Sequence, residues 1–64
     1  MRITVFRRQM AEEFGAARAE TLAKDHVLSG LGGRTIEEAL TAGVSAKEIW
    51  QEVCAEFGIP PERR

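Results

Sequence analysis

The sequence predicts an all-α protein: a compact bundle of about four short helices, formed by residues 1–64 as a single small domain. Three observations predict this fold class. Apolar residues recur at helical spacing through most of the chain. Two segments, beginning at Thr35 and Ser45, carry the Thr/Ser-x-x-Glu pattern that opens helices. No stretch alternates polar and apolar residues over a strand's length, apart from a short run between Arg2 and Phe6.

The first helix is expected to begin near Val5, with Thr4 as its N-terminal cap. Large apolar side chains repeat every four residues along it and predict one buried stripe: Phe6, Met10 and Phe14. Gly15 is expected to end or kink this helix, because glycine readily adopts the left-handed conformation found at helix ends.

A second helix is expected from Ala16 to about Ser29. It is rich in alanine, and such small side chains let a neighbouring helix approach closely. Three glycines then break the pattern: Gly30, Gly32 and Gly33. Leu31, held between them, is predicted to plug into the core.

The second half of the chain predicts two helices joined by a turn of about three residues. One begins at Ile36, behind a capping box formed by Thr35 and Glu38, and ends at Gly43. The other follows a second capping box formed by Ser45 and Glu48.

The last helix has a wide apolar stripe: Ile49, Trp50, Val53, Cys54 and Phe57. Val44 and Ile49 have the spacing of a hydrophobic staple at its start. Gly58 followed by Ile59 indicates a glycine cap with its hydrophobic contact, and the prolines after Ile59 stop the helix.

Composition excludes several classes of protein. The net charge is −1, which gives no general attraction to nucleic acid or to membranes. The single cysteine cannot form an internal disulfide, and no Cys/His cluster has zinc spacing, so no cofactor or metal is expected. No signal-peptide pattern and no run of about 20 apolar residues is present, so we expect a cytoplasmic protein without membrane association.

The sequence resembles a family of short actinobacterial proteins catalogued as domain of unknown function 3046. Nearly the whole chain takes part, through the segments Met1-Arg2-Ile3-Thr4-x-Phe6, Phe14-Gly15, Asp25-His26-Val27-Leu28, Leu31-Gly32-Gly33-Arg34-Thr35, Glu38-Ala39-Leu40, Gly43-Val44, Lys47-x-x-Trp50, Val53-Cys54 and Phe57-x-x-Pro60. The resemblance implies a stand-alone helical protein with no assigned activity and no assigned functional residues. Members of this family are often encoded near recombination and DNA-repair genes.

Nucleic-acid binding is the alternative function. Residues 38–49 are similar to a DNA-reading helix-turn-helix, but the exposed face of the last helix would be net negative and would repel phosphates. An ordinary αα-corner is therefore the favoured interpretation of this segment. Cationic candidates for anion or nucleic-acid contact remain elsewhere in the chain: Arg2, Arg7, Arg8 and, beside a glycine-rich helix start, Arg34. Arg34 is otherwise expected to bridge to Asp25 or to the end of the second helix.

An enzymatic role is not expected. Asp25 and His26 have the residue types of an oriented base, but no serine or cysteine is placed as a nucleophile. Cys54 falls on an apolar stripe, where thiols are usually inert.

We therefore expect a protein-protein interaction or adaptor module with an unidentified protein partner. Trp50 shares a stripe wider than a small bundle needs, so it is either a core filler or a partly exposed anchor for a partner, and the interaction hypothesis uses the second interpretation. Lys47 and Gln51 lie beside it on the last helix, whose acidic face would engage a basic partner.

Overall fold

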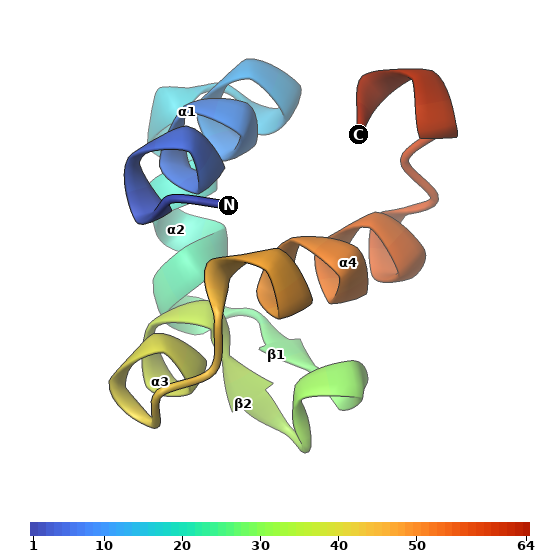
Figure 1. Cartoon of the computed structure of the whole chain (residues 1–64). Coiled ribbons are helices and arrows are strands. Elements are labelled where there is room, and N and C mark those ends of the chain that lie inside the picture. Colours follow the sequence, from blue (N-terminus) through green and yellow to red (C-terminus); the bar gives the residue numbers. More distant parts are fainter.

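Four α-helices form most of the fold in the computed structural model, which describes all 64 residues (Figure 1). They are α1 (Ile3–Phe14), α2 (Ala16–Asp25), α3 (Ile36–Thr41) and α4 (Ala46–Phe57). The all-α prediction is confirmed, with one addition: a two-stranded hairpin lies between α2 and α3. None of the helices is long and apolar enough to cross a membrane.

The two N-terminal helices pack against each other and are separated by one residue, Gly15. Gly15 ends α1 as predicted, and its N–H donates to Ala11 O at 2.8 Å. The predicted start of α1 is wrong, because the helix already begins at Ile3. Arg2 precedes it in extended conformation, and no side chain caps the helix, so Thr4 is an ordinary helical residue.

The hairpin corrects the predicted length of the second helix, since α2 ends at Asp25 rather than near Ser29. Strands β1 (Val27–Leu28) and β2 (Arg34–Thr35) pair in antiparallel register, with Val27 opposite Thr35. A 3₁₀ turn, η1 (Ser29–Leu31), and two glycines connect them, and Leu31 is buried as predicted.

Two consecutive residues of this connection, Gly32 and Gly33, have φ angles of 71° and 77°. Residues with a Cβ adopt this left-handed conformation only at a cost, so the glycine pair allows the chain to reverse here. The Gly33 N–H then donates to Leu28 O at 3.2 Å, which closes the turn.

The corner between α3 and α4 follows local sequence signals. Both bonds of the first capping box form: the Glu38 N–H donates to Thr35 Oγ1 at 3.1 Å, and the Thr35 N–H donates to Glu38 Oε1 at 2.9 Å. Only half of the second box forms, since the Glu48 N–H donates to Ser45 Oγ at 3.2 Å without the reciprocal bond. The αα-corner is present as expected.

One cluster of 14 buried hydrophobic residues forms the core, and it includes residues from every helix and from the hairpin. Figure 1 shows α4 crossing the middle of the molecule, with α1 on one side and the hairpin on the other. Accordingly α4 contributes most to the core, through Ala46, Ile49, Trp50, Val53 and Cys54. Gly58 ends α4 as predicted, Ile59 is buried, and the chain finishes in a 3₁₀ turn, η2 (Pro61–Arg63).

Candidate functional site

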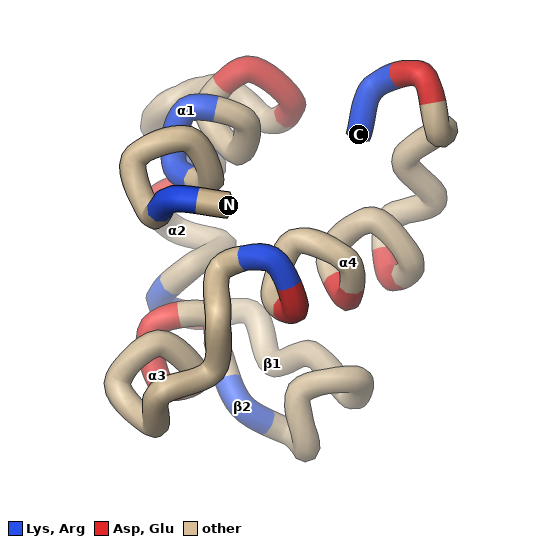
Figure 2. The backbone as a smooth tube through the Cα atoms, viewed as in Figure 1, with Lys and Arg blue, Asp and Glu red and all other residues tan.

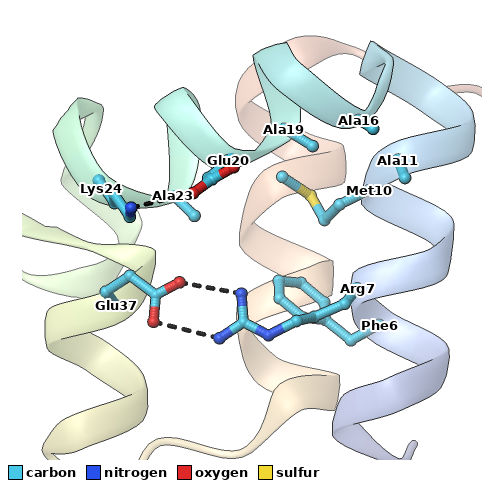
Figure 3. Close-up of a pocket in the computed structure, with 10 residues that line it drawn as sticks. All are labelled: Phe6, Arg7, Met10, Ala11, Ala16, Ala19, Glu20, Ala23, Lys24 and Glu37. Carbon is cyan, nitrogen blue, oxygen red and sulfur yellow. Dashed lines mark hydrogen bonds and ion pairs between the residues drawn. The ribbon is translucent and has the colours of Figure 1, made fainter.

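Three helices surround the largest surface hollow of the molecule, which we call the three-helix groove (Figure 3). Its volume is about 690 Å³, within the range of about 300–1,000 Å³ typical of ligand sites. Six apolar residues from α1 and α2 form its floor: Phe6, Met10, Ala11, Ala16, Ala19 and Ala23. Four of these are alanines, and their small side chains leave the groove hollow.

Two ion pairs form the charged rim of the three-helix groove. Arg7 of α1 donates two hydrogen bonds to Glu37 of α3, from Nη1 to Oε2 at 2.9 Å and from Nη2 to Oε1 at 3.1 Å. On α2, Lys24 Nζ donates to Glu20 Oε1 at 3.0 Å. Hydrogen bonds from Arg7 lower the pKa of the Glu37 carboxyl, and the bond to Glu20 raises the pKa of Lys24. Each charge on this rim therefore has an opposite charge beside it (Figure 3).

A second hollow with an apolar lining, which we call the Trp50 hollow, shares no residue with the three-helix groove. Its volume is about 500 Å³, and residues from both chain ends and from α4 line it: Met1, Lys47, Trp50, Gln51, Cys54 and Arg64. The structure thus places all three residues selected from the sequence as partner contacts, Trp50, Lys47 and Gln51, around one hollow.

Of the two interpretations of Trp50, the structure supports the core residue, because only 5% of its surface is accessible. Its ring makes an edge-to-face contact with the ring of Phe6, with centroids 6.2 Å apart and planes at 79°. Phe6 lies in the floor of the three-helix groove, so this aromatic pair separates the two hollows. Trp50 is both a core residue and part of the floor of a hollow.

The charged side chains around the Trp50 hollow are all positive. Lys47 forms no ion pair, and Arg64 uses only Nε, which donates to Ile59 O at 2.9 Å. No Asp or Glu side chain lines the hollow. Cys54 contributes to its floor, and burial raises the pKa of the Cys54 thiol, which keeps the sulfur in the protonated form at neutral pH.

The arginines predicted as anion contacts do not form one cluster. Figure 2 shows cationic segments at both chain ends, on α1, on β2 and at the start of α4, with acidic segments between them. Arg7 is bound by Glu37, and Arg8 Nε lies 3.9 Å from Glu12 Oε1. Arg2 and Arg34 are exposed and form no ion pair, so the expected bridge from Arg34 to Asp25 is wrong.

His26 is not oriented by its neighbour Asp25. Its Nε2 lies 3.7 Å from Glu56 Oε2, and its ring lies 5.1 Å from the Phe57 ring, between centroids. Both neighbours belong to α4, so His26 contributes to packing where α2 ends.

The sequence interpretation missed the three-helix groove. Arg7 and Glu37 are 30 residues apart, and nothing in the sequence pairs them. One signal was present, however: Ala16, Ala19 and Ala23 follow each other at three- and four-residue spacing and therefore share one face of α2. Small side chains at these three positions leave space unless a neighbour fills it.

The fold and these two hollows define a small helical protein with two separate, partly apolar surface depressions. The chain belongs to the family described as Protein of unknown function (DUF3046), whose sequence model matches residues 1–62. No curated protein and no solved structure matches the chain.

Proposed function

We propose that this chain is a non-enzymatic protein-interaction module whose three-helix groove receives an apolar helical segment of a partner protein. The observation that carries the proposal is the floor of the groove, where six apolar residues line about 690 Å³ of open space. The floor residue Ala16 and the rim residues Glu20 and Lys24 are exposed, so the groove opens to solvent and a segment of another chain can enter.

The chemistry of the groove specifies the occupant. Because four floor residues are alanines, the groove complements large side chains such as Leu, Ile or Phe. Met10 adds a flexible thioether that adapts to different apolar shapes. The rim charges are already paired with one another, so they do not favour a strongly charged partner. An uncharged apolar stripe on one helix face fits both conditions, as in other helix-in-groove complexes.

A matched pair of variants tests this proposal. Ala16 and Ala17 are both exposed and are adjacent at the start of α2, but only Ala16 lines the groove. Glutamate at either position is favourable at a helix N-terminus, so both variants should fold. Tagged wild-type protein, Ala16→Glu and Ala17→Glu would each capture partners from native lysate, with and without nuclease. A peptide from any captured protein would then be titrated against isotope-labelled chain by NMR.

Support would be a protein retained by wild type and Ala17→Glu but lost with Ala16→Glu, whatever the nuclease treatment. Its apolar helical peptide should shift the resonances of the groove residues. The proposal fails if Ala16→Glu loses no partner that Ala17→Glu retains. It also fails if retention requires intact nucleic acid, which would favour the nucleic-acid alternative through Arg2 and Arg8.

A further inference from the structure

We propose that the Trp50 hollow is a second, independent binding site, for a peptide segment that carries a carboxylate side chain beside a large apolar side chain. This inference does not depend on the function proposed for the three-helix groove. It reverses the expectation from sequence, in which an acidic face of α4 beside Trp50 would engage a basic partner.

The apolar part of the site is fixed by the core. Met1 supplies exposed apolar surface, and Trp50, which is 5% exposed, and the fully buried Cys54 lie behind it. The contact of Trp50 with Phe6 holds the indole in place, so the floor of the hollow exists before any partner binds. A preformed floor lowers the entropic cost of binding an apolar side chain.

The polar part of the site is cationic. Lys47 and Arg64 belong to none of the five ion pairs, and the only hydrogen bond of the Arg64 side chain uses Nε, so its two terminal guanidinium nitrogens have no acceptor in the chain. Two guanidinium N–H groups match the two oxygens of a carboxylate, which makes arginine a good carboxylate receptor. Gln51 adds an amide N–H that can donate to a carboxylate oxygen or to a backbone carbonyl of the peptide.

The acidic residues of α4 do not cancel this charge, because they lie on another side of the helix. Lys47, Trp50, Gln51 and Cys54 recur at three- and four-residue spacing and share one face. The three glutamates of α4 follow their own four-residue repeat: Glu48, Glu52 and Glu56. The charged side chains that line the Trp50 hollow are therefore Lys47 and Arg64, and the nearby Glu13 of α1 is paired with Arg63.

Short capped peptides test the proposal, with a central Leu flanked by Glu, by Gln or by Lys. Trp50 is the only tryptophan and there is no tyrosine, so the near-ultraviolet emission of the chain comes from the floor of this hollow. Its indole N–H has no acceptor in the chain and gives a second reporter by NMR. We expect saturable binding of the Glu peptide, affecting Trp50 and its neighbours, and no saturable binding of the Gln or Lys peptide.

Charge reversal provides the matched variants. Lys47→Glu and Arg64→Glu should each weaken binding of the Glu peptide about tenfold or more, and Lys47→Glu should gain binding of the Lys peptide. Arg18→Glu makes the same charge change on α2, where Arg18 is exposed and lines neither hollow, so it should leave the affinity unchanged. Position 47 lies in the first turn of α4, where an acidic side chain is favourable, so the Lys47→Glu variant should retain its fold.

Three results would overturn the proposal. The first is equal binding of the Glu and Gln peptides, which would show that the carboxylate is not recognised. The second is an equal loss of binding in Lys47→Glu, Arg64→Glu and Arg18→Glu, as a general electrostatic attraction between chain and peptide would produce. The third is a set of resonance shifts away from the Trp50 hollow. None of these results bears on the three-helix groove, because the variants that test the groove change different residues.

Discussion

Trp50 has two roles that a sequence alone cannot separate. Its position on the stripe of α4 is compatible with core and with surface, and the residue proves to be 5% exposed. The same ring also lines the Trp50 hollow, which Met1, Lys47 and Arg64 surround without filling. Substituting Trp50 would therefore disturb the core, so Lys47 and Arg64 are the informative residues for binding.

The ion pair between Arg7 and Glu37 gives a prediction for single residues. Glu37→Gln should lower the free energy of unfolding at pH 7 by about 0.5–1 kcal/mol, the upper part of the range for exposed pairs, because the wild-type geometry is bidentate. Glu12→Gln is the control, since Glu12 lies 3.9 Å from Arg8 and both side chains are largely exposed. It should change stability by no more than about 0.3 kcal/mol. Urea unfolding of the three proteins measures both effects.

The same pair sets a pH dependence in the acid range. Arg7 lowers the pKa of Glu37 in the folded state, so this contribution is complete above the unfolded pKa of about 4.3. It is lost as the pH falls further, through the folded pKa, where Glu37 takes up a proton. The stability difference between wild type and Glu37→Gln should therefore disappear at acidic pH. A difference that persists in acid would assign the effect to packing rather than to charge.

The pKa of Cys54 shifts in the opposite direction to that of Glu37. Burial raises the pKa of its thiol, so the folded state holds the proton more tightly than the unfolded state, whose pKa is about 8.5. The resulting contribution to stability is present below that pKa and is lost as the pH rises through the folded value. Wild type should thus lose stability in alkali relative to Cys54→Ala. At neutral pH the native thiol should react far more slowly with a disulfide reagent than the denatured thiol; equal rates would contradict its burial.

At the scale of elements, two glycines differ in what they require. Gly43 joins α3 to α4 with φ of 91°, and its N–H and that of Val44 donate to Leu40 O and Ala39 O at 3.1 and 3.0 Å. Gly43→Ala should lower the free energy of unfolding by about 1–2 kcal/mol, because a residue with a Cβ is strained in this left-handed conformation. Gly30 has no such φ, and an added Cβ would meet only the end of the Glu52 side chain, which can move.

Gly30→Ala should therefore change stability by less than about 0.5 kcal/mol. Thermal unfolding of the two variants distinguishes them, and equal stabilities would show that the left-handed turn at Gly43 does not constrain the corner in solution.

Three helix boundaries set by local chemistry were predicted correctly, whereas the Thr4 cap of α1 and the end of α2 were not. The Thr35 box and the caps at Gly15 and Gly58 depend on neighbouring residues, so their patterns are visible in the sequence. The end of α2 depends on Val27 and Leu28 pairing with β2, across a connection that contains three glycines. Strands of two residues are too short to show an alternating pattern, so the hairpin had no sequence signature.

For the whole molecule, the sites were only partly predictable. Lys47, Trp50 and Gln51 could be grouped in advance because they share one helix face. Met1 and Arg64 complete the same hollow from opposite ends of the chain, which no local pattern reveals. The three-helix groove depends on the position of α3 relative to α1, as the pairing of Arg7 with Glu37 shows.

Because the chain has a single core, we expect it to unfold as one cooperative unit. All 14 buried hydrophobic residues belong to one cluster, which includes Leu28 and Leu31 from the hairpin and Ile59 from beyond α4. The hairpin should therefore not unfold separately from the helices. Emission from Trp50 and helical circular dichroism should give the same urea midpoint, as a two-state transition requires.

Leu31→Ala provides the decisive comparison. This substitution should lower the free energy of unfolding by about 2–5 kcal/mol, which is a large part of the total stability of a small domain. Because the core is shared, it should move both midpoints together, although Leu31 lies outside all four helices. If the urea midpoint measured from Trp50 emission were unchanged in Leu31→Ala, the hairpin would unfold as an independent unit. Neither hollow would then depend on the hairpin, since no hairpin residue lines either one.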